Sequence, residues 1–172
     1  MDIYELIENR QSIRNYKDKE VEEEKLDRIL EAGRKAPSAK NIQPWKFIVT
    51  RKNDLKQKLV KACHDQKFMG EADIILTIAV NIDQAYKQQG EYMSSFAVDG
   101  SIAMDHMMLA ATAEGLGTCW IGAFSEEEVK EVLGIPKNYR VVGLTPIGYI
   151  KEKSSSTSRK SLEEIVVNEK WN

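Results

Sequence analysis

Residues 74–82 read Ile-Ile-Leu-Thr-Ile-Ala-Val-Asn-Ile, a nearly continuous apolar run. The run is far shorter than the roughly 20 residues that cross a bilayer, and it is typical of a β-strand that is covered on both faces. It therefore predicts the central strand of a sheet, and the other elements are expected to pack around it.

Further strands and helices are expected on both sides of this run. Residues 45–50 are rich in aromatic and β-branched side chains, and residues 140–149 have the pattern of a last strong strand. Apolar residues at helical spacing predict helices at residues 3–7, 22–35, 54–64, 92–114 and 125–133. Asp54 is expected to be an N-cap, and Ser125 with Glu128 has the pattern of a capping box.

The helix predicted over residues 92–114 is apolar on most of its sides, which indicates burial in a core or in a dimer interface. Gly115 and Gly117 are expected to end it. Asp99 and Asp105 within it could act as functional acids, but polar-face or capping roles are the favoured alternative.

The bulk composition is that of an ordinary globular protein, and one domain is expected over residues 1–172. The 25 basic and 27 acidic residues give a formal charge of -2, so nucleic acid and anionic membranes are not expected as partners. The acidic start Met1-Asp2 lacks the basic region of a signal peptide, which makes the cytoplasm the expected location.

The chain length also bears on how a site could be built. One domain of 172 residues leaves little room for both a nucleotide pocket and a separate substrate module, so a subunit interface could supply the missing walls. The C-terminal segment is too apolar for a free tail and is expected to dock, with a second subunit as one option. Its apolar residues are Leu162, Ile165, Val166 and Val167.

The cysteines and histidines do not have the spacing of a metal site or a disulfide framework. Cys63 and Cys119 are far apart, and reduced thiols are the simplest interpretation. Cys119 is better explained as a small buried residue than as a nucleophile, because no histidine lies nearby in the sequence to activate it. His64 and His106 are isolated, so structural roles are favoured for both and no metal is expected.

Arg10-Gln11-Ser12-Ile13-Arg14, called here the arginine hook, is a candidate anion site. In an extended chain Arg10, Ser12 and Arg14 share one face, which brings two guanidinium groups and a hydroxyl around one small volume. A phosphate would fit that volume. The alternative is a pair of solvated arginines at a helix end, and the hook alone does not separate the two interpretations.

Residues 37–43, called here the polar loop, lie between a predicted helix and a predicted strand. The sequence Pro-Ser-Ala-Lys-Asn-Ile-Gln-Pro-Trp at 37–45 is longer and more polar than a plain connection of about 2 to 6 residues requires. The amides of Asn41 and Gln43 could read a heteroaromatic edge, and Ser38 could meet hydroxyl groups. A self-satisfied turn, with Trp45 filling the core, is the alternative.

Gly-Leu-Gly-Thr-Cys-Trp-Ile-Gly at 115–122, called here the glycine segment, alternates small with bulky residues. Such a segment lets the backbone approach a flat ligand closely. It is not a GxGxxG dinucleotide fingerprint, because no strand is expected before it and the third glycine is missing. The basic pair Arg159-Lys160 becomes relevant only if it closes over the same anion as Arg10.

Taken together, five motifs resemble the nitroreductase family of FMN flavoproteins in order and spacing, over nearly the whole chain. They are R-Q-S-I-R at 10–14, A-P-S-A-K-N-I-Q-P-W at 36–45, G-L-G-T-C-W-I-G at 115–122, P-I-G-Y at 146–149 and R-K-S-L-E-E at 159–164. The resemblance implies an α+β fold with a central, mostly antiparallel sheet flanked by helices. It also implies an intertwined homodimer with the long helix at the interface and two FMN sites.

The resemblance further implies which residues bind FMN. The phosphate and ribityl chain would be held by the hook and by the basic pair, here Arg10, Gln11, Ser12, Arg14, Arg159 and Lys160. The flavin would be lined by the polar loop of the partner subunit, here Pro37, Ser38, Ala39, Asn41 and Gln43. Backbone N–H groups near Ile121 and Gly122 would reach the N5 side of the ring.

For activity, the resemblance implies a ping-pong oxidoreductase. NADH or NADPH would give a hydride to flavin N5, and a small acceptor such as a nitroaromatic or a quinone would then stack in the same place. No catalytic residue is assigned, because the cofactor carries the chemistry. The alternatives are a specialised flavoenzyme of the same fold, of the reductive dehalogenase or flavin-fragmenting type, and a non-catalytic FMN-binding module.

Overall fold

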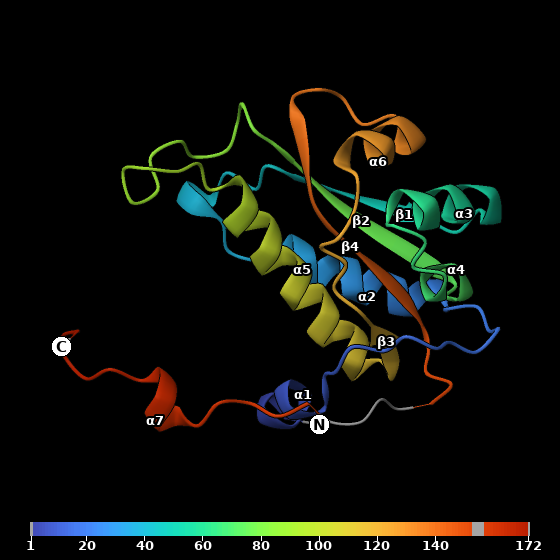
Figure 1. The fold of residues 1–172 in the computed structure, drawn as a ribbon, viewed down its shortest axis with the longest axis horizontal. Helices are drawn as coiled ribbons and strands as arrows, with labels where there is room; N and C mark the ends of the chain where they lie inside the picture. The colour runs from blue at the N-terminus through green and yellow to red at the C-terminus, as the bar shows by residue number, and fades with distance from the viewer. Residues whose placement is uncertain (1, 153–156, 172) are drawn as a thin grey trace.

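The computed structural model describes residues 2–152 and 157–171, so Met1 and Asn172, the ends of the single domain expected above, lie outside the described residues. The fold is α+β, as expected, with a four-stranded antiparallel sheet of order β1-β2-β4-β3 (Figure 1). The strands are β1 (Trp45–Thr50), β2 (Ile74–Asn81), β3 (Leu116–Thr118) and β4 (Tyr139–Tyr149).

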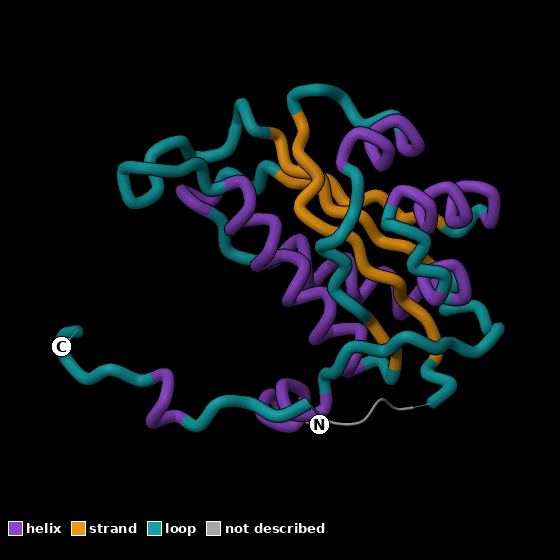
Figure 2. Tube along the Cα trace, in the orientation of Figure 1, coloured by secondary structure: helices purple, strands orange, loops and turns teal. Residues whose placement is uncertain are grey.

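Helices cover both faces of this sheet, as the helix and strand colours of Figure 2 make visible. The helices are α1 (Ile3–Asn9), α2 (Glu23–Arg34), the short 3-10 helix η1 (Ala39–Asn41), α3 (Asn53–Ala62), α4 (Phe68–Glu71), α5 (Phe96–Ala113), α6 (Glu126–Leu133) and α7 (Leu162–Ile165). Helices α2 and α5 pack together on one face, and α3, α4 and α6 lie on the other.

The central strand β2 is buried along its whole length, which confirms the prediction from its apolar sequence. Side chains alternate between the two faces of a strand, so each face of β2 belongs to a different core. Leu76 and Ile78 pack in the core beneath α2 and α5, whereas Ile75 packs in the core beneath α3 and α6. Both layers of helices are therefore held by the same strand.

The long helix α5 begins at Phe96, four residues later than the sequence pattern suggested. Residues 82–95, which precede the helix, form a separate loop, called here the excursion, in which the Ser95 N–H donates to the Tyr86 carbonyl at 2.8 Å. A Cβ added to Gly100 would lie 2.7 Å from Val142 on β4, so this turn of α5 lies close against the sheet. The helix ends at Ala113, and Gly115 follows the C-cap Glu114 with a φ of +74°, which favours glycine.

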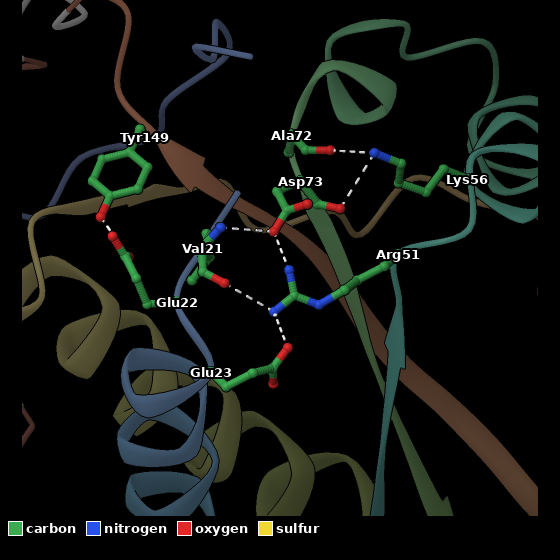
Figure 3. Close-up of polar contacts among 8 residues, drawn as sticks. All are labelled: Val21, Glu22, Glu23, Arg51, Lys56, Ala72, Asp73 and Tyr149. Atoms are coloured by element: carbon green, nitrogen blue, oxygen red, sulfur yellow. Dashed lines mark hydrogen bonds and ion pairs between the residues drawn. The ribbon is translucent and has the colours of Figure 1, made fainter. Parts of the chain in front are cut away.

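A polar cluster fixes the chain that follows the arginine hook (Figure 3). The Asp73 carboxylate accepts from the Val21 N–H at 2.9 Å and from the Arg51 guanidinium, which also donates to the Val21 carbonyl at 3.0 Å. Nearby, the Tyr149 hydroxyl donates to Glu22 at 2.6 Å, and this hydrogen bond is the largest cause that lowers the pKa of Glu22 to about 2. The segment leading into α2 is thus tied to the sheet.

Three local expectations need correction. Helix α3 begins at Asn53 with Lys52 as its N-cap, so Asp54 lies in the first turn, where a carboxylate favours the helix dipole without capping it. Ser125 Oγ accepts from the Glu128 N–H at 3.4 Å, but the Ser125 N–H donates to the Ala62 carbonyl at 2.7 Å rather than to the Glu128 side chain, so only half of the capping box forms. Residues 116–118 form a strand that the sequence did not predict.

Within residues 2–152 and 157–171, none of the helices combines the length and the apolar character that a membrane span requires.

Candidate functional site

The arginine hook is extended and lies beside β3. Ser12 forms a parallel bridge with Thr118, and the Ile13 N–H donates to the Thr118 carbonyl at 2.8 Å. The Ile13 side chain is 1% exposed, so it anchors the hook in the core. Since neighbours along an extended chain point to opposite sides, Arg10, Ser12 and Arg14 face away from Ile13. The backbone pairing at Ser12 and Ile13 thus agrees with the extended segment on which the expected anion site depends.

Two features outside the motif hold the hook in place. A Cβ added to Gly117 would lie 2.8 Å from Ile13 Cγ1, so only glycine lets β3 come this close to the hook. The buried Tyr16 hydroxyl donates to the Ile13 carbonyl at 2.7 Å, and burial raises the pKa of Tyr16 above its usual value. Tyr16 therefore remains a neutral hydrogen-bond donor. The sequence reasoning used neither Tyr16 nor the packing of Gly117 on Ile13.

The arginines of the hook differ from most other arginines of the chain in lacking a carboxylate partner among the described residues. Four other arginines form ion pairs with a carboxylate: Arg28, Arg34, Arg51 and Arg140. Arg10 and Arg14 form none with a described residue, although they lie in a chain that is acidic overall. Two guanidinium groups without an internal anion, on one face of a fixed segment, are suited to an external anion.

Gln11 faces the other side of the hook and has an unsatisfied polar atom. Its Oε1 is buried and has no hydrogen-bond partner among the described residues. The side chain lines a cavity of about 250 Å³, together with Thr112 of α5 and the backbone at Gly115 and Gly117. Because buried polar atoms are rarely left unpaired, this oxygen indicates a missing donor such as a ligand hydroxyl or a water.

The polar loop has an unusual backbone. Lys40, Asn41 and Gln43 have φ values of 51°, 56° and 53°, a region that L-residues other than asparagine, aspartate and histidine seldom adopt. Hydrogen bonds within the loop stabilise it: the Gln43 N–H donates to Ser38 Oγ at 2.9 Å, and the Gln43 amide donates to Asn41 Oδ1 at 3.0 Å. Such strain persists only where the surroundings fix it, and it clusters at functional sites.

The self-satisfied turn that was the alternative interpretation is thus partly present. However, Asn41 and Gln43 are exposed and Ser38 and Ala39 are half-buried, so the loop still presents polar groups at the surface. Pro37 is exposed as well. Trp45 is 8% exposed and packs in the core, as that interpretation also expected.

The hook and the polar loop lie at opposite ends of α5 (Figure 1). The hook adjoins Thr112 near the end of the helix, whereas the Ala39 N–H of the loop donates to Asp99 near its start, at 2.9 Å. Residues 99 and 112 of one helix are about 20 Å apart at 1.5 Å per residue. The cavity beside the hook is lined by no residue of the loop. One chain therefore does not bring these two parts together.

The glycine segment includes β3, which lies beside the hook, and leads toward α6. The Ile121 N–H donates to the Leu144 carbonyl at 2.8 Å, so it is already used within the sheet. The N–H of exposed Gly122 has no acceptor among residues 2–152 and 157–171. The neighbouring Trp120 indole is 37% exposed. Gly122 is thus the better candidate of the two for a backbone contact to a ligand.

The basic pair Arg159-Lys160 lies in a C-terminal segment that extends away from the rest of the molecule (Figure 1). Both side chains are exposed, and Arg159 donates to Thr157 Oγ1 at 2.6 Å rather than to a group near the hook. The segment also exposes large apolar side chains: Leu162 (74%), Ile165 (60%), Val166 (51%), Val167 (50%) and Trp171 (87%). These residues have no covering surface within the described part of the chain.

The cysteines do not point to thiol chemistry. Cys119 is 2% exposed, which agrees with the small buried residue expected from the sequence. Cys63 is fully buried, and this burial raises the pKa of its thiol to about 12, so it carries no thiolate near neutral pH. Among the described residues, no three His, Cys, Asp or Glu side chains are grouped as a metal site would require.

A larger cleft of about 800 Å³ lies beside the polar cluster of Figure 3, and its lining includes Tyr16, Lys56 and Asp73. Basic and acidic side chains line it in equal number: Lys17, Lys19, Lys56 and Lys151, and Asp18, Glu20, Glu71 and Asp73. Mixed charges of this kind do not select an ion of either sign. Its buried ammonium, Lys56, already donates to the Ala72 carbonyl at 2.6 Å. We therefore assign no ligand to it.

Comparison with known proteins gives consistent matches. The model of the protein family described as "Nitroreductase family" matches residues 7–68 and 62–149 of the chain. An NADH dehydrogenase of Thermus thermophilus is 30% identical over 187 residues, covering 92% of this chain and 91% of its own length.

Solved structures agree with the fold. A nitroreductase family protein of Clostridium difficile 630 superposes with a TM-score of 0.90 at 32% identity, covering 99% of this chain and 100% of that one. An FMN-dependent nitroreductase of Clostridium difficile R20291 superposes with a TM-score of 0.80 at 29% identity, covering 96% and 99%. The relatives have nearly the same length as this chain, so the similarity extends over the whole fold.

Proposed function

Because this chain belongs to the nitroreductase family and is an oxidoreductase, we propose that it binds FMN and transfers electrons from NADH or NADPH to a small acceptor. The observation that carries the proposal is the pair Arg10 and Arg14, which have no carboxylate partner among the described residues and share one face of a fixed segment. The FMN-dependent relative from Clostridium difficile supports the choice of cofactor.

The residues of the hook fit an FMN phosphate and ribityl chain. Two guanidinium groups can bind a phosphate dianion through charge-assisted hydrogen bonds, and Ser12 lies between them in sequence on the same face. Gln11 faces the other side of the segment, where its orphaned oxygen is an acceptor for a hydroxyl of the cofactor outside the phosphate-binding face. Arg159 and Lys160 would add positive charge once the C-terminal segment docks, which is a separate part of the proposal.

A second copy of the chain would complete the site. The polar loop is about 20 Å from the hook along α5, so the loop that meets a given hook would come from the partner. Pro37, Ser38, Ala39, Asn41 and Gln43 would then line the flavin. The exposed apolar residues of α1 and of the C-terminal segment support such a partner, because they need a surface to cover them.

The chain's own groups would then bind FMN, orient its ring and shield it from solvent. When FMN is bound, NADH or NADPH would deliver a hydride to it, and after the oxidised nucleotide leaves, a nitroaromatic or a quinone would take the electrons in the same place. The Gly122 N–H would orient the edge of the ring, and the hook would hold its phosphate end. No acid or base of the protein is required, since these contacts only have to position the cofactor and stabilise charge on it.

The direct test is to purify the protein, add FMN and remove the excess. We expect the visible absorption of bound flavin, with two FMN per dimer, and bleaching of that absorption when NADH or NADPH is added without oxygen. Protein that stays colourless after incubation with FMN would contradict the proposal. Protein that holds FMN but is bleached only over many minutes would point to a non-catalytic FMN-binding module.

A panel of acceptors separates the general reductase from a specialised flavoenzyme. A general reductase should turn over nitroaromatics and quinones at comparable rates after reduction. A specialised enzyme, such as a reductive dehalogenase, should reduce these compounds slowly and show fast turnover with one substrate class. The measurement is the rate of acceptor consumption under steady-state conditions with each reductant.

A further inference from the structure

Asp99 is a buried carboxylate that the proposed mechanism does not use. It lies in the first turn of α5 and is 2% exposed. No ion pair with a described Lys or Arg compensates its charge. An uncompensated buried charge is costly, so the groups that stabilise it are informative.

Two hydrogen bonds and the start of the helix stabilise this carboxylate. Oδ1 accepts from the Ala39 N–H of the polar loop at 2.9 Å, and Oδ2 accepts from the Ser95 hydroxyl at 2.7 Å. Free N–H groups in the first turn of a helix also favour a negative charge. The Ala39 N–H and the Ser95 hydroxyl thus both donate to Asp99. Of these two partners, Ala39 belongs to the candidate site.

The anchor on the α5 side is rigid. The Gly100 backbone lies so close to the sheet that an added Cβ would meet Val142 at 2.7 Å and Val80 at 3.0 Å. Ser95 is itself fully buried, and its N–H donates to the Tyr86 carbonyl at 2.8 Å. The turn of α5 that carries Asp99 is therefore held against the central sheet, and the hydrogen bond to the Ala39 N–H fixes the loop relative to this turn.

The polar loop needs such an anchor because its backbone is strained. Three of its residues have positive φ, and the hydrogen bonds within the loop do not connect it to the body of the molecule. On the outer side, Lys40 Nζ lies 4.6 Å from the centre of the Tyr86 ring. The buried bond to Asp99 is thus a charge-assisted link from the loop to α5.

We propose that Asp99 is a positioning residue, which holds the Ala39 backbone so that the polar loop keeps the shape required at the flavin. This inference rests on the proposed function, because the loop would serve the FMN site of the partner chain. Asp99 does not touch the cofactor itself. It acts through Ala39, and through Ser95 it also ties the excursion at residues 82–95 to the same point.

The test compares Asp99→Ala with Asp99→Asn in the full-length protein. Alanine removes both acceptors, and the dissociation constant for FMN should rise about tenfold, the effect of losing one charge-assisted hydrogen bond. Asparagine keeps an oxygen for the Ala39 N–H and offers an amide to the Ser95 oxygen, so its constant should stay within about threefold of wild type. Hydrogen exchange of the Ala39 amide should become fast in the alanine variant and remain slow in the asparagine variant.

Asp54→Ala is the matched control, since Asp54 is exposed on α3 on the opposite face of the sheet. It should leave both FMN binding and exchange at Ala39 unchanged. If Asp99→Ala does not fold, Ser95→Ala removes one of the two partners and should weaken FMN binding about threefold, with partial loss of protection at Ala39.

The outcomes separate the two proposals. Wild-type protein that takes up no FMN would overturn the proposed function, and this inference with it. The inference alone would be overturned if wild-type protein binds FMN and Asp99→Ala shows the same dissociation constant for FMN. The Ala39 amide of that variant would also stay protected from exchange. Equal loss of thermal stability in Asp99→Ala and Asp99→Asn, with FMN binding unaffected in both, would assign Asp99 a purely structural role and also overturn it.

Discussion

Replacing Arg10 and Arg14 together by alanine should raise the dissociation constant for FMN by at least about 100-fold, since each lost charge-assisted contact to phosphate is worth about 1.5 to 3 kcal/mol. The fold should survive, because neither side chain forms an ion pair with a described residue and Arg14 is exposed. The measurement is a titration of the apoprotein with FMN, followed by flavin fluorescence, alongside thermal unfolding.

Arg34→Ala is the control for this pair. Arg34 is an exposed arginine whose partner is Glu31 one turn earlier in α2, and it lies far from the hook in sequence. Its removal should leave FMN binding unchanged and cost at most about 1 kcal/mol of stability. If the double variant had the same dissociation constant for FMN as wild type and Arg34→Ala, the hook would not be part of the FMN site.

Gly117→Ala should lower the free energy of unfolding by about 1 to 3 kcal/mol, the usual cost of overpacking. The new methyl group would lie 2.8 to 2.9 Å from three atoms of the buried Ile13 side chain. Relief requires the hook to shift away from β3, so FMN affinity should fall as well. Chemical denaturation and FMN titration of the same preparation measure both effects.

Gly122→Ala gives the comparison for stability. The nearest atom to its added methyl group is Trp120 Nε1 at 3.5 Å, an ordinary contact, so the free energy of unfolding should change by no more than about 0.5 kcal/mol. If Gly117→Ala were as stable as Gly122→Ala, the close packing of β3 against Ile13 would not determine the position of the hook.

Much of the fold was predictable because its elements have strong local patterns. The strand at 45–50 and the buried run from residue 74 were located from side-chain type alone, and the structure places β1 and β2 there. The sequence pattern did not predict the short strand β3, in which the close packing depends on a glycine. Strand β3 consists of Leu116, Gly117 and Thr118, which is too short to show alternation, and it forms because the hook and β4 pair on either side of it.

The candidate site was predictable in its motifs but not in its framework. Arg10 and Arg14 were selected because they would share one face of an extended segment, and the polar loop because it is longer and more polar than a plain connection requires. The residues that hold them do so through long-range contacts, such as Asp99 to Ala39 over 60 positions. No local pattern distinguishes such a carboxylate from one on the polar face of a helix, and the interpretation of Asp99 as a capping or polar-face residue missed its bond to the loop.

The separation of the hook from the polar loop leads to the central claim, that each FMN site is shared between two chains. Two variants test it in combination. One chain carries Arg10→Ala and Arg14→Ala, and the other carries Asn41→Gly and Gln43→Gly, which remove the loop amides while glycine tolerates their positive φ. Each homodimer then lacks one half of both of its sites.

The decisive measurement is the FMN content of the heterodimer of these two chains, isolated with two different affinity tags. In it, the intact hook of one chain meets the intact loop of the other at one site, and both defects fall together at the second site. The account predicts one FMN per heterodimer at concentrations at which both homodimers remain empty. A heterodimer as empty as the homodimers would contradict it.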